Sequence, residues 1–398
     1  MPFKRIYLIV ADSLGVGEEP DAARFGDVGS NTFKHASYSL SDFAVPTLAS
    51  LGVGALGDIN NTPDVPSHPH SYVMRLREES NGKDTMTGHW EMMGIYTEKP
   101  FKTFTDTGFP KELIAELEEK TGHKILGNVA ASGTEIIKVL GEEAMKENAL
   151  IVYTSADSVL QIAAHEEVTG LQELYRCCEI AREMCLRPEY RVGRVIARPF
   201  LGDSPANFKR TSNRHDYALK PPLPTDLNAL MEAGYKTNGI GKIGDIFDMY
   251  GIGDSVHTVS NEDGMDKTIL DAKERKEAGL TFVNLVEFDS EYGHRRNPEG
   301  YARCIMAFDA RLKELLPLIG EDDLLLITAD HGNDPTFKGT DHTREKVPFI
   351  AYSPSFTKGR YLEERSSFAD IGASILENFG LGKPEHLIGT PISEILGD

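Results

Sequence analysis

Cysteine is scarce in this 398-residue sequence, and the few cysteines do not follow the spacing of a zinc site or a disulfide framework. The four are Cys177, Cys178, Cys185 and Cys304. The adjacent pair falls on a predicted helix, where cysteines rarely build a disulfide framework. We therefore expect reduced thiols, which are typical of a cytosolic protein.

Long apolar runs are missing as well. No stretch approaches the roughly 20 apolar residues that a membrane-spanning helix needs. The first apolar run, Arg5–Val10, is too short and becomes polar too soon for a signal peptide. These absences predict a soluble, cytoplasmic protein.

Positive charge is the third scarcity. The chain has 42 Lys and Arg against 62 Asp and Glu, a formal net charge of -20. This excess of acid argues against nucleic acid or an anionic membrane as the main partner. A small anionic substrate stays compatible, because a local basic cluster or bound cations reverse the field inside one cleft.

The sequence does contain a repeated pattern, in which an apolar run is followed by an aspartate. The runs are Arg5–Val10 before Asp12, Leu280–Phe288 before Asp289, and Leu324–Ile327 before Asp330. Continuous apolar runs are typical of strands buried on both faces of a mostly parallel sheet. Ligands bind beyond the carboxyl ends of such strands, so we expect the three aspartates at one site.

Histidines follow two of these aspartates closely. His331 is adjacent to Asp330, His294 comes five residues after Asp289, and a second Asp-His pair ends at His342. One such pair alone is better explained as a turn that caps a helix or loop. Three carboxylates and three imidazoles exceed one tetrahedral site but suit two divalent metals, Mn²⁺ or Zn²⁺ more than Ca²⁺. Paired cations of this kind stabilise phosphoryl transfer.

A candidate nucleophile lies in the segment from Gly82 to Glu91, where Thr85 and Thr87 stand between glycines. A loop-to-helix turn of this kind often holds a nucleophile, and the N–H groups at the helix start favour a phosphate. The alternative is a simple Asp/Thr helix cap.

The composition changes near Pro100 and again at the proline-rich connector Lys220–Pro224. Between them, the pattern predicts helices at 110–122 and 171–186, and strands at 125–129, 149–154 and 193–200. We therefore expect residues 101–221 to form an inserted α/β cap domain. Residues 1–100 and 222–398 would then form the two parts of a core domain.

Basic residues gather in the predicted insert, including Arg191, Arg194, Arg198, Lys209, Arg210 and Arg214. A solvated basic face is one explanation. A phosphate clamp is the other, because guanidinium groups bind phosphate oxygens in pairs.

A second glycine-rich motif, Gly239-x-Gly241-x-x-Gly244, surrounds Lys242. It is weak evidence for a nucleotide cofactor, because the strand before it is short and polar. Close backbone approach beside Lys242, which could face a substrate phosphate, explains the glycines equally well.

Four segments together resemble the phosphopentomutase family, the bacterial mutase branch of the alkaline phosphatase superfamily. They are DSLGVG from Asp12, GKDTMTGHWE from Gly82, DSEYGH from Asp289 and TADHGNDP from Thr328. The likeness covers essentially the whole chain, including the ARPFLGD and RHDY segments of the insert. It implies an alkaline-phosphatase-like α/β core, with a mostly parallel sheet flanked by helices, and an inserted α/β cap.

The resemblance also implies the activity, which is interconversion of ribose 1-phosphate and ribose 5-phosphate and of the 2-deoxyribose equivalents. It implies two Mn²⁺ ions, with Co²⁺ or Zn²⁺ as alternatives, and a phosphothreonine intermediate. By position, Asp12, Asp330 and His331 would bind one metal and Asp289, His294 and His342 the other. Thr85 falls at the nucleophile, three residues before Gly88-His89.

Two further features are implied by the resemblance. A sugar bisphosphate such as glucose 1,6-bisphosphate would load the threonine, and the cap would exclude water. The candidate substrate contacts are Asp157, Arg194, Arg210 and Lys242. A metal-dependent phosphatase or phosphodiesterase on the same scaffold is the nearest alternative, and a non-catalytic metal- or phosphate-binding protein is a more distant one.

Overall fold

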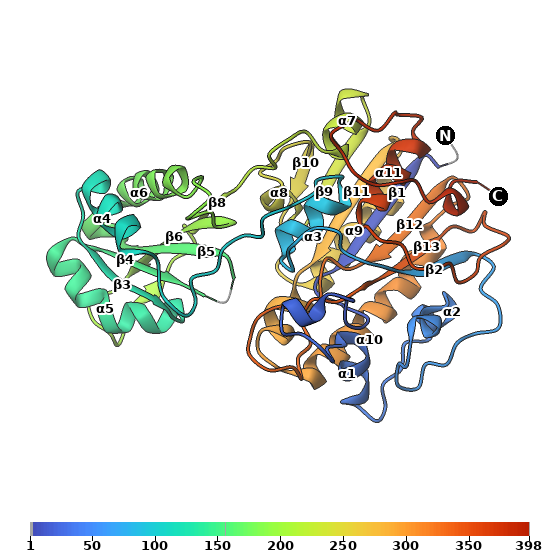
Figure 1. Ribbon diagram of the computed structural model, residues 1–398, viewed down its shortest axis with the longest axis horizontal. Helices are drawn as coiled ribbons and strands as arrows, with labels where there is room; N and C mark the ends of the chain where they lie inside the picture. Colours follow the sequence, from blue (N-terminus) through green and yellow to red (C-terminus); the bar gives the residue numbers. More distant parts are fainter. Residues whose placement is uncertain (1–2, 156, 398) are drawn as a thin grey trace. The chain divides into compact units, whose positions relative to one another are not determined.

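A computed structural model describes residues 3–155 and 157–397. The chain forms two compact units (Figure 1). The larger unit combines Met1–Pro100 with Pro221–Asp398, and the smaller unit is the continuous segment Phe101–Lys220. Each is an α/β unit with its own sheet.

The larger unit is built on a seven-stranded sheet with β1 in its middle (Figure 1). In order across the sheet, the strands are β10 (Asp254–Val256), β9 (Lys236–Ile240), β11 (Gly279–Leu285), β1 (Arg5–Ala11), β12 (Asp323–Thr328), β13 (Val347–Tyr352) and β2 (Ser71–Leu76). The first five run parallel, and β13 and β2 pair antiparallel. The predicted α/β fold with a mostly parallel sheet is therefore confirmed.

The register of the central strands brings their polar ends together. Val10 of β1 is opposite Asn284 of β11 and Thr328 of β12. The strands β1, β11 and β12 consist almost entirely of buried residues. They are apolar because helices cover both faces of the sheet, as in parallel sheets generally. The chain segments that follow them therefore leave at one sheet edge.

Helices of the larger unit pack against the sheet and one another. They are α1 (Thr32–Tyr38), α2 (Pro46–Ser50), α3 (Thr85–Met92), α7 (Asp226–Glu232), α8 (Ile243–Ile246), α9 (Asn261–Glu274), α10 (Pro298–Leu315) and α11 (Ala369–Asn378). Single turns occur at η1 (Ala22–Arg24), η2 (Val53–Leu56), η4 (Phe288–Gly293), η5 (Leu316–Leu318) and η6 (Ser393–Ile395). The π-helical turn η4 follows β11 and carries Asp289.

The smaller unit has a six-stranded sheet. Its strands are β3 (Ile125–Ala130), β4 (Leu150–Thr154), β5 (Val159–His165), β6 (Arg194–Leu201), β7 (Lys209–Arg210) and β8 (His215–Ala218). Its helices are α4 (Lys111–Thr121), α5 (Gly133–Glu147), the π-helical turn η3 (Glu166–Gly170) and α6 (Leu171–Met184). One apolar cluster includes residues of α4 and α6, and another includes residues of α5.

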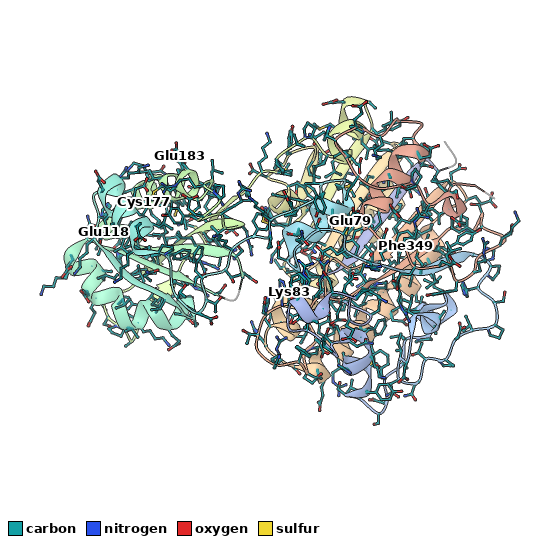
Figure 2. All side chains as sticks on the ribbon, in the orientation of Figure 1. Glu79, Lys83, Glu118, Cys177, Glu183 and Phe349 are labelled. Atoms are coloured by element: carbon teal, nitrogen blue, oxygen red, sulfur yellow. The ribbon has the colours of Figure 1, made fainter. Side chains whose placement is uncertain are left out.

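All four cysteines are free thiols. Cys177, Cys178 and Cys185 are buried in the first of these apolar clusters, and Cys177 is labelled in the smaller unit in Figure 2. Within residues 3–155 and 157–397, no helix has the length and apolar character required to cross a membrane.

Candidate metal centre and nucleophile

The first cluster of candidate ligands leaves the ends of β1 and β12. Asp12 follows β1, and Asp330 and His331 follow β12; all three side chains are buried. His331 Nε2 lies 3.5 Å from Asp12 Oδ1 and 3.4 Å from Asp330 Oδ2. Neither oxygen has a hydrogen-bond partner in the part of the chain that the structure describes. These two buried carboxylate oxygens and the nearby imidazole nitrogen together form a donor set that fits a divalent cation.

Neighbouring groups fix the remaining oxygens of these carboxylates. The Ser13 backbone N–H donates to Asp330 Oδ1 at 2.9 Å, and Asn284 Nδ2 donates to Asp12 Oδ2 at 2.9 Å. Ser13 holds a left-handed φ of 70°, a conformation that non-glycine residues adopt mainly where the surroundings impose it. One oxygen of each carboxylate is thus held by the protein, and the other is left for a ligand.

The charges in this cluster repel one another. Burial and the negative charges of Asp330 and Asp289 raise the pKa of Asp12 well above its usual range. Burial acts on Asp330 in the same direction, but His331 and His89 bring the pKa of Asp330 below its ordinary value. A cation among these carboxylates would relieve the repulsion, which again fits a metal.

The second cluster lies on turns and loops. Asp289 belongs to η4, His294 follows that turn, and His342 comes after a loop beyond β12. His294 Nε2 lies 3.1 Å from Asp289 Oδ2, and His342 Nε2 lies 3.5 Å from Asp289 Oδ1. The two imidazole nitrogens are 3.1 Å apart. Although burial raises it, the two imidazoles hold the pKa of Asp289 well below its ordinary value.

The two clusters adjoin, because the His331 and His342 rings stack with centroids 3.9 Å apart. In each of the three imidazoles, Nδ1 faces a backbone carbonyl. The partners are Thr340 for His294 at 2.7 Å, Gly332 for His331 at 3.0 Å, and Lys83 for His342 at 2.9 Å. An imidazole whose Nδ1–H donates to a carbonyl carries no hydrogen on Nε2, and this is the tautomer that binds a metal through Nε2. Lys83 is labelled in the larger unit in Figure 2.

The two threonines of the candidate nucleophile segment have different surroundings. Asp84 caps α3, and its carboxylate accepts both the Thr87 backbone N–H at 3.1 Å and the Thr87 hydroxyl at 2.6 Å. Thr85, the first residue of α3, instead places Oγ1 3.2 Å from His331 Nε2. Of the two hydroxyls, that of Thr85 is therefore the one beside the clusters.

Gly88 and His89 bring α3 against the end of β12. A Cβ at Gly88 would lie 2.2 Å from the Asp330 carbonyl oxygen, so only glycine allows this contact. His89 Nδ1 lies 2.8 Å from the Thr85 carbonyl oxygen and 3.2 Å from Asp330 Oδ2. Sequence analysis did not single out His89 or Asn284 as site residues. A signal existed for Asn284, which is a lone amide inside the apolar run of β11.

The candidate substrate contacts divide between the two units. In the smaller unit, Arg194 of β6 lies 3.6 Å from Asp157, and Arg210 belongs to β7. Other basic side chains lie near Arg198 in this unit: burial and the charges of Arg214 and Arg210 lower the pKa of Arg198 to about 10. Arginines gathered in this way are suited to bind an anion.

The fourth candidate, Lys242, caps α8 in the larger unit. It follows Gly241, which has a φ of +84°, and a Cβ at Gly241 would lie 2.3 Å from the Asn284 carbonyl oxygen. Close packing against β11 thus accounts for this glycine. The glycine-rich motif therefore needs no nucleotide cofactor to explain it.

Comparison with known proteins gives three findings. A family model described as the metalloenzyme superfamily matches residues 4–383. The chain is 57% identical over 390 residues to the phosphopentomutase of Clostridium beijerinckii, covering 98% of both chains, and 55% identical over 396 residues to that of Clostridium tetani, covering 99% of both. Among solved structures, the PH0037 protein from Pyrococcus horikoshii matches with a TM-score of 0.49 and 12% identity over 98% of this chain and all of that one.

Proposed function

The chain belongs to the phosphopentomutase family, and from this premise we propose how its residues move a phosphoryl group between the C1 and C5 oxygens of a pentose. The substrates are ribose 1-phosphate and ribose 5-phosphate, together with their 2-deoxyribose equivalents. The observation that carries the proposal is the Thr85 hydroxyl, which lies 3.2 Å from His331 Nε2 beside both ligand clusters.

Two Mn²⁺ ions would complete the centre, and Co²⁺ or Zn²⁺ would suit the same ligands. Asp12, Asp330 and His331 would hold one ion, and Asp289, His294 and His342 would hold the other. Within the described residues, Asp12 Oδ1 and Asp330 Oδ2 have no hydrogen-bond partner, and Nδ1 of each imidazole faces a carbonyl; both observations support these side chains as metal ligands. When bound, such cations neutralise phosphoryl oxygens and favour the deprotonated form of a nearby hydroxyl.

Thr85 is the nucleophile. In the loaded enzyme, the free sugar oxygen loses its proton and attacks phosphorus of the phosphothreonine, the bond from phosphorus to Thr85 Oγ1 breaks, Oγ1 takes the proton, and a pentose bisphosphate forms. Thr85 Oγ1 then loses that proton and attacks the phosphorus of the other phosphate, the bond from phosphorus to its sugar oxygen breaks, that oxygen takes the proton, and the phosphothreonine is regenerated. The N-terminal backbone N–H groups of α3 stabilise the phosphoryl oxygens during both steps. Thr87 is excluded from this role because its hydroxyl donates to Asp84.

We propose that residues 101–221 are an inserted cap domain and that residues 1–100 and 222–398 form the core. Arg194 and Arg210 in the cap and Lys242 in the core are the proposed phosphate contacts, because their cationic groups suit phosphate oxygens. Asp157 orients the sugar. A sugar bisphosphate such as glucose 1,6-bisphosphate loads phosphate onto Thr85 at the start of the cycle.

Peptide mass spectrometry after incubation with Mn²⁺ and glucose 1,6-bisphosphate tests this mechanism. We expect one phosphate on the peptide that contains Thr85, and none after Thr85→Val. Thr87→Val is the matched control, and it should still accept phosphate on Thr85. Phosphate on Thr87 would overturn the assignment. Release of inorganic phosphate in place of C1-to-C5 transfer would favour the phosphatase alternative.

A further inference from the structure

One guanidinium group, that of Arg296, joins the chain segments that carry the second ligand cluster. Its N–H groups make five hydrogen bonds across three segments. Nη1 donates to Gly293 O at 2.9 Å, Asn333 Oδ1 at 2.5 Å and Asp334 O at 3.1 Å; Nη2 donates to Asp341 O at 2.9 Å; Nε donates to Gly339 O. These segments are η4, the turn after β12 and the loop that leads to His342.

Each acceptor is close to a ligand of this cluster. Gly293 precedes His294, and Asp341 precedes His342. Asn333 receives the Arg296 bond on Oδ1 and donates from Nδ2 to Asp289 Oδ1 at 2.7 Å. Because a guanidinium has only N–H donors, it fixes which end of the Asn333 amide faces Asp289. Arg296 therefore reaches every ligand of the second cluster through one neighbouring residue.

The backbone of Arg296 is also unusual. Its φ of 52° lies in the left-handed region, which residues other than glycine, asparagine and aspartate rarely adopt. Such a conformation persists where the surrounding structure determines it, and it is more frequent at functional sites. The adjacent Arg295 differs, because its side chain is 65% exposed and pairs with Glu291 one helical turn earlier.

An arginine of this kind could simply stabilise the loop. A comparison of the two clusters indicates a more specific role for Arg296. The candidate ligands of the first cluster directly follow β1 and β12, so their positions need no such connection. The second cluster combines residues that are 53 positions apart, from Asp289 to His342, and both of them lie outside the strands. Without a connection, the separation of these ligands would vary as the loop moves.

We propose that Arg296 is a positioning residue that holds Asp289, His294 and His342 at metal-binding separation before the metal arrives. The inference rests on the proposed function, in which these three residues bind the second divalent cation. Arg296 does not touch the metal or the substrate. It raises affinity by removing the need to order the loop at the moment of binding.

Equilibrium dialysis of the full-length protein against Mn²⁺, with metal analysis of the retained protein, tests this role. Wild type and the control Arg295→Ala, which removes the same charge from the exposed neighbour, should each bind two Mn²⁺. Arg296→Ala should bind the second Mn²⁺ about 10- to 100-fold more weakly, the usual effect of losing a group that orients a ligand. Arg296→Lys should also be weakened, because an ammonium cannot reproduce the planar fork of donors.

A merely structural role predicts another result. Arg296→Ala would then melt at a lower temperature but bind both Mn²⁺ ions with wild-type affinity, which would overturn the proposal. If Arg296→Ala does not fold, Asn333→Ala tests the same connection and should also weaken the second Mn²⁺. Wild-type affinity in that variant would likewise overturn the proposal. In a folded Arg296→Ala variant, excess Mn²⁺ should restore kcat and leave the KM for ribose 5-phosphate unchanged.

Asp289→Ala separates this inference from the proposed function. If that variant still binds two Mn²⁺ ions, the ligand assignment itself is wrong. If it binds one while Arg296→Ala binds two at wild-type affinity, the ligand assignment stands and only the role of Arg296 is wrong.

Discussion

The two clusters of candidate ligands contain the same kinds of side chain but are supported in different ways. Asp12, Asp330 and His331 are 2%, 0% and 1% exposed and leave strands whose backbones are fixed by the parallel sheet. In the second cluster, the His294 side chain is 21% exposed, and its position depends on bonds to loop carbonyls. The sheet therefore makes the first cluster rigid, whereas side-chain bonds must organise the second.

The largest effect is expected at the first cluster. Asp330→Ala should lower kcat by more than about 100-fold and remove one bound Mn²⁺, because loss of a mere supporting group already costs 10- to 100-fold. Excess Mn²⁺ should not restore activity, since the rigid sheet cannot move another ligand into place. Asp322→Ala, which changes the exposed residue just before β12, is the control. Two Mn²⁺ ions at full occupancy in Asp330→Ala would contradict the assignment.

A smaller and reversible loss is expected at the second cluster. His294→Ala should shift the Mn²⁺ concentration for half-maximal activity upward by at least about 10-fold, with activity returning at high Mn²⁺. A partly exposed site on loops allows water to replace the imidazole. His257→Ala, which removes a histidine whose side chain is 76% exposed, should change nothing. Activity that Mn²⁺ fails to restore would mean that the second cluster is as rigid as the first.

A third prediction concerns the support of the first cluster. Asn284→Ala removes the amide that donates to Asp12 Oδ2 and should weaken the first Mn²⁺ about 10-fold. The effect should be smaller than loss of a ligand, because β1 still fixes Asp12. Separate titration of the two metals checks this, and preferential weakening of the second metal would contradict it.

The smallest effect on activity, but a measurable one on stability, is expected at Asp226 in α7. Both of its carboxyl oxygens are buried with no hydrogen-bond partner in the described part of the chain, and burial raises its pKa to about 7. Its backbone N–H donates to Met93 O, next to the end of α3. The neutral acid is therefore the form that suits the fold.

The sign of the pH dependence follows from this raised pKa. The unfolded carboxyl ionises near pH 3.8 and the folded one near 7, so stability falls as pH rises through this window. The full loss amounts to about 4 kcal/mol at 1.36 kcal/mol per pH unit. Thermal melting of the metal-free protein at pH 5 and pH 8 should show a smaller fall for Asp226→Asn. An equal fall in both proteins would contradict the assignment.

The parts of the fold that could be predicted from sequence are those whose pattern is local. The apolar runs that became β1, β11 and β12 are continuous, and their buried pairing brought Asp12, Asp289 and Asp330 to one edge. The helix that became α4 was equally clear, because it is amphipathic and ends at Gly122, whose φ is +76°.

Other elements depend on tertiary contacts. Helix α5 was not predicted, because Gly133 and Gly141 lower its helix propensity; a Cβ at Gly141 would lie 2.6 Å from the Phe208 ring. Strand β5 was also missed, since Gln161 and two alanines interrupt its apolar pattern, and its pairing with β4 and β6 decides its conformation. Helix α9 begins at Asn261, where the Ser260 side chain caps it by accepting the Asp263 backbone N–H.

The same distinction holds at the site. Aspartates and histidines at strand ends could be recognised, but the carbonyls that orient the imidazoles could not. Lys83 and His342, for example, are 259 residues apart. Every residue type has a backbone carbonyl, so the sequence does not indicate which carbonyl contacts a given imidazole. The bonds of Arg296 were hidden for the same reason, since four of its five acceptors are backbone oxygens.

The pairing of β1 with β12 determines the order in which parts of the chain can fold during synthesis. Arg5 and Asp323, which face each other across β1 and β12, are 318 residues apart. The smaller unit, by contrast, is one continuous segment and is complete long before β12 is translated. Because domains generally fold as they emerge from the ribosome, the smaller unit can fold before β12 is available to pair with β1. Thr85 is then synthesised early, but its neighbour His331 comes late, so an unfinished chain lacks the assembled candidate site.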